Sequence, residues 1–371
     1  MKIQEVTIHK ISLSLHTPYA VAYHTYTEFE PVIVEVRDAD GRVGWGESNI
    51  SAGASKETPE SGYAFSVEHA EKIVGMDTAD AKKMLLAKIK ESKMAVSALV
   101  PAIEMLEDNA LLRFEKETHI PLLTPFNTRL GGDIAGEVER RLEEGYKTFK
   151  IKVGKKSDSV AKDLEYIAAI QKANAGRATL RMDANRGYTR EQGCEFASNL
   201  DPDSLMLFEQ PCAADAWDDN AAVAKVSAVP LMLDESISLA EDIDRAGEMD
   251  GVGFCKLKLK RCGSLDMLKD AIEHCKELGM NAVLGDGTGM EIGNWMEAAV
   301  ARVCIDNAGE FNGFLKLDDH LFTEELRFEK GDMIIPAGYY PAVDRAKLLS
   351  FAIKEPARFS VPKTALKGAA E

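Results

Sequence analysis

Three carboxylates, Asp183, Glu209 and Asp234, each close a short apolar run and are separated by 26 and 25 residues. A strand with its connecting helix takes roughly 30 residues, so this repeat places each carboxylate at the end of a strand in consecutive units. Strand ends in a barrel of such units meet on one face, where active sites are built. Oxygen ligands without neighbouring cysteine or histidine favour Mg²⁺, with Mn²⁺ as the alternative. We therefore predict a divalent metal site; unrelated helix-capping acids are the other reading.

Two pairs of lysines stand on either side of these carboxylates. Lys150 and Lys152 alternate with apolar residues before them, and Lys256 and Lys258 do so after them. Because side chains alternate along a strand, each pair shares one face. Lysines on strands usually mark solvated edge strands, but two such pairs around three acids favour lysines that point into the site. A like-charge pair lowers the pKa of both amines. We expect lysine bases that remove a proton next to a carboxylate and, with the metal, stabilise the resulting enediolate.

The elements that position these residues alternate between strand and helix from about residue 120. Apolar runs of strand length are followed by amphipathic helical patterns, which is typical of a parallel sheet. The expected strands cover residues 148–153, 180–183, 205–209, 230–234, 253–259, 281–285 and 313–317. The number of units, close to eight, favours a closed barrel over an open sheet.

The first part of the chain has a different pattern. Strand-like runs over 31–37 and 43–47 flank the turn residues Asp40 and Gly41, which predicts a β-hairpin. Helical patterns dominate from 67 to 117. This part is therefore expected to be an α+β domain, which the mixed pattern of the last 50 residues rejoins.

Composition bounds the classes of function. A chain of 371 residues is long for one core, so two domains are expected. The net charge of −16 disfavours binding to nucleic acid or to an anionic membrane. The sequence has no apolar run of transmembrane length and no signal-peptide stretch near Met1, so a cytoplasmic location is expected. The six cysteines form no CxxC pair and are expected to be free thiols.

Taken together, the motifs resemble those of the muconate-lactonizing subgroup of the enolase superfamily, over nearly the whole chain. The residues 150–152 resemble its KxK motif, and the segments around the three carboxylates resemble its three metal-ligand motifs in order. The stretch 258–263 resembles its second-lysine motif, KLxKxGG, with Ser264 replacing the last glycine. That alignment selects Lys258, rather than Lys256 or Lys260, as the second base.

The resemblance implies an α/β fold in which a modified TIM (β/α) barrel over 119–320 carries an N-terminal α+β capping domain over 1–118. The segment 321–371 would pack back on the capping domain. It implies Mg²⁺ on the three carboxylates and a small-molecule carboxylate substrate bound to the metal. It also implies a homo-oligomer, as related proteins often assemble symmetrically.

The resemblance further assigns roles around the reacting carbon. Lys152 and Lys258 would face its opposite sides, Lys150 would tune Lys152, and Asn185 and Glu235 would support the metal ligands. Two bases on opposite faces are what a racemase or epimerase of an N-substituted amino acid or related carboxylate requires.

Several residues are candidates for substrate binding. Members that epimerise dipeptides tend to carry Asp-x-Asp at the eighth strand, whereas this chain has Lys316 and Asp318 there. A lysine would attract an acidic or N-blocked distal part of the substrate; a salt bridge from Lys316 to Asp318 or Asp319 is the alternative. The glycine-rich stretch 285–291 offers Asp286 and Glu291. His24 lies in a loop that the family places over the substrate, and we expect it to bind rather than to catalyse.

The sequence leaves other functions open. A dehydratase or a cycloisomerase would use the same scaffold and the same intermediate. A barrel that only binds an acidic ligand is a further alternative, although every expected ligand and base position is filled. A phosphate-binding barrel would need a glycine-rich loop after strand seven or eight, for which only 285–289 qualifies, and it would leave the three acids unexplained.

Overall fold

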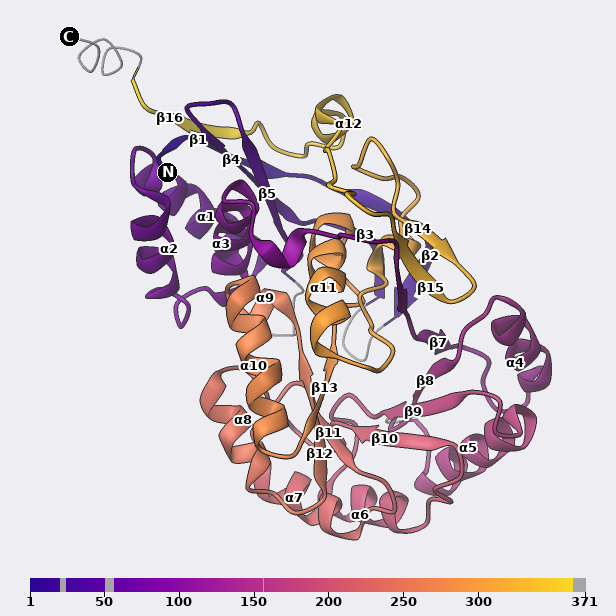
Figure 1. Ribbon diagram of the computed structural model, residues 1–371. Coiled ribbons are helices and arrows are strands. Elements are labelled where there is room, and N and C mark those ends of the chain that lie inside the picture. The colour runs from indigo at the N-terminus through magenta and orange to yellow at the C-terminus, as the bar shows by residue number, and fades with distance from the viewer. Residues whose placement is uncertain (21–24, 51–56, 156, 363–371) are drawn as a thin grey trace.

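A computed structural model describes residues 1–20, 25–50, 57–155 and 157–362 (Figure 1). Seven parallel strands form a curled sheet in the order β13, β12, β11, β10, β9, β8 and β7. The strands are β7 Thr124–Phe126, β8 Thr148–Lys152, β9 Thr179–Asp183, β10 Leu205–Glu209, β11 Leu231–Leu233, β12 Val252–Leu257 and β13 Asn281–Leu284. The sheet is the barrel part of the fold that the sequence predicts, and the expected α/β class is confirmed.

A short extended segment joins the two edges of this sheet. At the β7 edge, the amide of Gly309 donates to the carbonyl of Pro121, and the amide of Leu123 donates to the carbonyl of Gly309, both at 2.9 Å. At the β13 edge, the amide of Glu310 donates to the carbonyl of Leu284 at 2.9 Å. Residues 309 and 310 therefore occupy the eighth strand position.

The expectation of a strand over 313–317 is wrong. Residues Gly313–Lys316 form a 3₁₀ helix, η2. Gly313 packs directly on the preceding loop, since a Cβ at this residue would lie 1.8 Å from the carbonyl oxygen of Gly289. The apolar run 313–317 thus packs against a loop beyond the barrel. The less apolar residues 309 and 310 take the eighth strand position instead.

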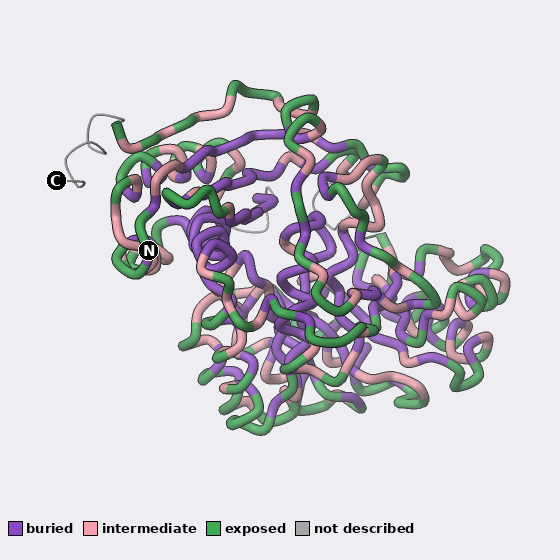
Figure 2. The backbone as a smooth tube through the Cα atoms, turned by 45° about the horizontal axis from the view of Figure 1, so that its top comes forward, coloured by how far each residue is buried: buried purple, intermediate pink, exposed green. Residues whose placement is uncertain are grey.

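Helices surround the sheet, as the alternating sequence pattern predicts (Figure 1). Ser264 caps one of them, because its side chain accepts a hydrogen bond from the amide of Met267 at 3.0 Å. The helices are α4 Ile134–Glu143, α5 Val160–Asn174, α6 Arg190–Ser198, α7 Trp217–Val226, α8 Ala240–Gly247, α9 Leu259–Cys262, α10 Leu265–Glu277 and α11 Glu291–Cys304. Figure 2 shows that the buried residues concentrate between these helices and the sheet.

The capping domain is a four-stranded antiparallel sheet covered by helices. The sheet order is β16, β1, β4 and β5. The predicted hairpin is confirmed, because β4 pairs with β5 around a turn in which Gly41 has φ +83°. Gly44 and Gly46 let β5 approach α3, since a Cβ on either would lie 1.9 Å from a carbonyl oxygen of that helix. The elements are β1 Ile3–Lys10, β4 Val32–Asp38, β5 Val43–Ser48, β16 Ala357–Ser360, α1 Pro59–Ile73, α2 Thr78–Leu86 and α3 Lys93–Leu106.

A second hairpin, β2 Leu13–Ala20 and β3 Thr25–Phe29, reaches from the capping domain to the barrel. Ser14 accepts a hydrogen bond from the amide of Asp318 at 3.0 Å. A ring nitrogen of His16 lies 2.8 Å from the carbonyl oxygen of Leu315. The hairpin therefore sits beside η2. Its connection contains His24, which lies outside the described residues.

The C-terminal part contributes to two sheets. β14 Arg327–Glu329 pairs with β15 Asp332–Ile335, and β15 pairs with β6 Thr118–Pro121, which gives a separate three-stranded antiparallel sheet, whereas β16 joins β1 of the capping sheet. Between them lies α12 Arg345–Ser350, and η1 Ala110–Leu112 precedes β6. Within the described ranges, every helix is too short or too polar to cross a lipid bilayer.

Candidate active site

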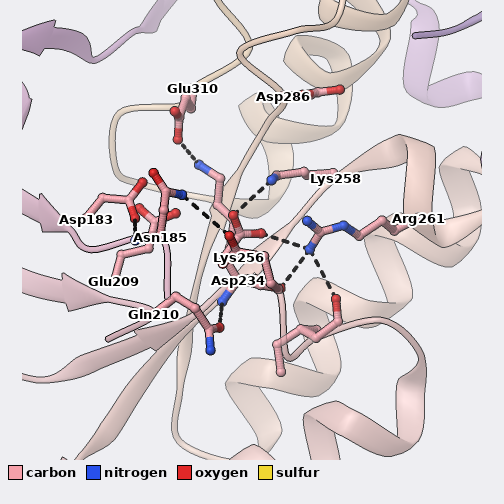
Figure 3. A network of polar contacts seen from close by, with 12 residues as sticks. Asp183, Asn185, Glu209, Gln210, Asp234, Lys256, Lys258, Arg261, Asp286 and Glu310 are labelled. Atoms are coloured by element: carbon pink, nitrogen blue, oxygen red, sulfur yellow. Dashed lines mark hydrogen bonds and ion pairs between the residues drawn. The ribbon is translucent and has the colours of Figure 1, made fainter. Parts of the chain in front are cut away.

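The three predicted metal-ligand carboxylates lie at the ends of neighbouring strands. Asp183 and Glu209 are paired across β9 and β10, and Asp234 follows β11 directly. All three side chains are buried. The side-chain oxygen of Gln210 fixes this edge by accepting hydrogen bonds from the amides of Asp234 at 2.9 Å and Ser236 at 3.2 Å (Figure 3).

Strands β8 and β12 flank these three strands and bring in the lysines. The ammonium of Lys150 lies 2.9 Å from Asp183 and 2.8 Å from Glu209. Lys152 lies 2.6 Å from Asp183, and Lys258 lies 3.0 Å from Asp234. The structure thus brings together the acids and both lysine pairs. Lys152 and Lys258 each contact the carboxylate of the neighbouring strand.

The two lysines of each pair differ in exposure. The side chains of Lys150 and Lys256 are 5% and 1% exposed, whereas those of Lys152 and Lys258 are 24% and 14% exposed. The more accessible lysine of each strand is therefore the one that the resemblance selects as a base. The buried lysine of each pair forms ion pairs with carboxylates: Lys150 with Asp183 and Glu209, and Lys256 with Glu310.

The expected lowering of the lysine pKa values is wrong for the first pair. Burial lowers the pKa of Lys150, but Asp183, Glu209 and Glu310 outweigh it and raise this pKa well above its ordinary value. Burial also lowers the pKa of Lys152, and the charge of Asp183 again outweighs it and raises the pKa. The predicted lowering rested on burial and on the repulsion between the two ammonium groups. Attraction by the carboxylates is stronger because more of them lie close by.

Glu310 is a site residue that sequence analysis missed. From the eighth strand position it pairs with Lys150 at 2.8 Å and with Lys256, the buried lysines of the two flanking strands. No motif marks it, because the segment around it lacks the apolar pattern of a strand. The clue in the sequence was its position just before residues 313–317, the expected eighth strand.

Replacing Glu310 with glutamine is expected to lower the free energy of unfolding by about 3–5 kcal/mol, since a buried charge loses its partner. Urea unfolding followed by circular dichroism measures this change. The matched control is Glu273→Gln, which breaks a surface pair with Lys269 and should change stability little. Equal stability of the two variants would contradict a structural role for the buried pair.

The residues expected to support the metal ligands lie beside them. The side-chain oxygen of Asn185 accepts a hydrogen bond from the Lys152 ammonium at 2.5 Å, and its backbone amide donates to Asp183 at 2.8 Å. The Oε1 atom of Glu235 lies 3.5 Å from the side-chain amide nitrogen of Asn185 and 3.3 Å from Nε of Arg186. Asn185 has φ +42°, a conformation that a non-glycine residue rarely adopts and that clusters at functional sites.

The carboxylates fit a hard divalent cation by their chemistry. Among the described residues, no three Asp, Glu, His or Cys side chains are already grouped to hold a metal ion. The carboxylates instead pair with Lys150, Lys152 and Lys258. All the donors are nonetheless oxygens on adjacent strand ends, as Mg²⁺ prefers. One oxygen of Glu235 is also buried without a hydrogen-bond partner.

Two of the substrate-binding candidates are held by other parts of the protein. Asp286 pairs with Lys260 at 2.6 Å and accepts a hydrogen bond from the Thr288 amide at 3.1 Å, so its carboxylate is already satisfied away from the ligand cluster (Figure 3). Glu291 accepts a hydrogen bond from the amide of Leu321. It therefore ties the start of α11 to the C-terminal segment.

Lys316 and Asp318 lie in different surroundings. The ammonium of Lys316 donates to the carbonyl of Gly287 and to the side chain of Asn312, both at 2.8 Å, and lies 4.8 Å from the ring centre of Tyr19. These partners replace the salt bridge that the sequence left as an alternative. Burial lowers the pKa of Lys316 to about 8. Asp318 is exposed.

Comparisons with known proteins agree with this fold. Residues 133–339 match the family described as enolase C-terminal domain-like, and residues 3–110 match the mandelate racemase / muconate lactonizing enzyme N-terminal domain. The aromatic dipeptide epimerase of Herpetosiphon aurantiacus is 29% identical over 349 residues, which cover 89% of this chain and 93% of that protein. Other relatives are o-succinylbenzoate synthases and muconate cycloisomerases.

Solved structures share the fold. The N-succinyl Arg/Lys racemase of Bacillus cereus has a TM-score of 0.86 at 20% identity, with 98% of this chain and all (100%) of that chain covered. A dipeptide epimerase of Cytophaga hutchinsonii, complexed with Mg and the dipeptide D-Ala-L-Val, has a TM-score of 0.85 at 21% identity, with 97% and 100% covered. With both domains matched in order, the chain belongs to the mandelate racemase/muconate lactonizing enzyme family of the enolase superfamily.

Proposed function

We propose that this protein is a Mg²⁺-dependent enzyme that removes the proton next to a substrate carboxylate. The observation that carries the proposal is the placement of two accessible lysines on the strands that flank the ligand strands. Lys152 on β8 contacts Asp183, and Lys258 after β12 contacts Asp234. A general base must lie within reach of the proton that it takes, and these two amines bracket the carboxylate cluster.

The residues of the site would have separate roles. Mg²⁺, held by Asp183, Glu209 and Asp234, would supply positive charge to the substrate carboxylate as negative charge develops there. Lys152 and Lys258 move the proton. Asn185 orients the amine of Lys152 through the hydrogen bond described above.

Racemisation or epimerisation of an N-substituted amino acid or related carboxylate is the reaction that two opposed bases support best. One amine takes the proton, and the ammonium of the other returns one to the opposite face. The relatives include an aromatic dipeptide epimerase and an N-succinyl-L-Arg/Lys racemase. Dehydration or cycloisomerisation on the same scaffold is the second candidate, because o-succinylbenzoate synthases and muconate cycloisomerases are also relatives.

The test is a screen of acids in deuterated water with MgCl₂, followed by NMR of the α-proton. The panel contains both enantiomers of N-succinyl and N-acetyl amino acids, dipeptides, betaines and hydroxy acids. Exchange with inversion and without loss of water supports the isomerase, and loss of water or ring closure supports the second candidate. Binding of Mg²⁺ without exchange on any acid would contradict catalysis and leave a barrel that only binds acids.

Lys316 is proposed to bind an anionic distal group of the substrate. Its half-buried ammonium lies among a carbonyl, an amide and the Tyr19 ring rather than a carboxylate, so it lacks a counter-charge of its own among these contacts. Lys316→Asp is expected to raise KM for N-succinyl acids at least about tenfold, as loss of one partner of a buried charge pair costs 2–5 kcal/mol.

The pH dependence follows from the lowered pKa of Lys316. In the free protein the charged form is lost as the pH rises through about 8, so KM for N-succinyl acids should rise above that pH. N-acetyl acids, which lack the distal charge, provide the control. Unchanged kinetics of Lys316→Asp on every acid would exclude this role.

A further inference from the structure

A buried carboxylate on α11 joins the ends of two barrel strands. One oxygen of Glu297 accepts a hydrogen bond from the amide of Leu259 at 2.9 Å, and the other accepts one from the amide of Asp286 at 3.0 Å. The side chain is 2% exposed. Leu259 directly follows Lys258, and Asp286 lies just after β13. Glu297 therefore holds the chain beside the proposed base without touching the base itself.

The same helix is fixed to the capping domain. Glu47, at the end of β5, accepts hydrogen bonds from the amides of Met290 at 2.5 Å, Ile292 at 3.1 Å and Gly293 at 3.1 Å. These amides belong to the first turn of α11 and its cap, which have no partner within the helix. A carboxylate at this end also complements the helix dipole. The position of α11 is thus set by a residue of the capping domain.

A second contact strengthens this junction. Lys260, in α9, pairs with Asp286 at 2.6 Å and donates to the hydroxyl of Thr288 at 3.0 Å. The side-chain amide of Asn49, two residues after Glu47, donates to the carbonyl of Thr288 at 2.9 Å. The strand ends that Glu297 joins are therefore also tied to each other and to the capping domain through side chains.

We propose that Glu297 is a positioning residue for Lys258. Through Glu297 and α11, the position of this base would depend on how the capping domain packs against the barrel. The inference rests on the proposed function and deepens it. Lys258 lies just beyond β12, at a turn that is also held by a hydrogen bond from the Arg261 amide to the Lys258 carbonyl at 2.9 Å. Loss of the Glu297 acceptor would leave the Leu259 amide buried and unpaired, which costs more than the hydrogen bond contributes. The base would then lose its fixed place over the substrate.

The variant Glu297→Gln keeps the size of the side chain but replaces one acceptor oxygen with a donor. Either Leu259 or Asp286 then faces an N–H group in place of an oxygen. The matched control is Glu137→Gln on α4. Glu137 is also 2% exposed and accepts hydrogen bonds from the amides of Asn127 at 3.1 Å and Thr128 at 2.5 Å. That pair of hydrogen bonds lies past β7, on the Lys152 side of the barrel.

The first readout is a ratio measured within one sample. For the acid of the panel that exchanges fastest, the α-proton exchange rate of the enantiomer assigned to Lys258 is divided by that of the enantiomer assigned to Lys152. The assignment comes from Lys152→Ala and Lys258→Ala. The fraction of folded enzyme cancels in this ratio. Glu297→Gln is expected to lower the ratio at least tenfold, and Glu137→Gln is expected not to lower it.

The second readout needs no substrate. Amide hydrogen exchange of peptides covering Leu259 and Asp286 is expected to accelerate at least tenfold in Glu297→Gln and to stay unchanged in Glu137→Gln. An unchanged enantiomer ratio in Glu297→Gln, with equal loss on both faces, would overturn the positioning role. Unchanged amide exchange would overturn it as well. If the unmodified protein exchanges the α-proton of none of the acids, the proposed function is overturned instead. Amide hydrogen exchange of the protein would then still decide whether Glu297 holds the backbone.

Discussion

Replacing Lys152 with alanine is expected to abolish exchange of the substrate α-proton from one face and to leave exchange from the other face. Replacing Lys258 should give the opposite result. The two amines reach the carboxylate cluster from strands on opposite sides of it and contact different carboxylates, those of Asp183 and Asp234. Each can therefore serve one face of the reacting carbon. A positioned general base contributes about 10²–10⁴-fold, so a loss of this size is expected for one enantiomer and little change for the other.

The measurement uses both enantiomers of the best acid in deuterated water, followed by NMR at the α-proton. Net racemisation should be lost in both variants, because inversion needs both bases. The control is Lys256→Met, which removes a buried lysine of the same strand as Lys258 but leaves the more exposed one; its effect should fall on both enantiomers alike. Two-sided racemisation retained in either alanine variant would remove that lysine from the mechanism.

The positions of the acids and lysines could be predicted because strand ends repeat with the length of a βα unit. Asp183, Glu209 and Asp234 close apolar runs, and the lysines alternate with apolar residues. The pattern alone therefore places the acids at the same end of neighbouring strands and each lysine pair on one face of its strand. Local patterns carry this information because the geometry of a strand is set by its own residues.

Other features depend on contacts that no local pattern encodes. Residues 309 and 310 close the sheet through hydrogen bonds to β13 and to the chain before β7, and their own sequence has little strand character. The apolar run after them instead packs as η2. The pKa of Lys150 is raised rather than lowered because it meets three carboxylates from other strands. Glu297 lies inside a helical pattern, where a single glutamate is normally a solvated residue.

Removing the divalent metal is expected to stop exchange from both faces, unlike either lysine variant. In the proposed mechanism, Asp183, Glu209 and Asp234 hold the cation that binds the substrate carboxylate, and the charge of this cation is needed whichever amine takes the proton. Lewis-acid stabilisation is worth several kcal/mol, which corresponds to roughly a thousandfold in rate. Treatment with EDTA should therefore abolish exchange for both enantiomers, and added MgCl₂ should restore it.

Glu209→Gln separates loss of the metal from loss of folding. Glu209 lies between the other two proposed ligands in sheet order, and its ion-pair partner is Lys150 rather than either proposed base. The variant should weaken Mg²⁺ binding at least about tenfold, measured by calorimetric titration with MgCl₂, and should lower exchange from both faces equally. Urea unfolding without metal shows whether the loss of a Lys150 partner alone destabilises the protein. A face-selective loss in Glu209→Gln would mean that this carboxylate acts on one base rather than on the metal. Full exchange after EDTA would mean that the lysines stabilise the negative charge of the substrate without a cation.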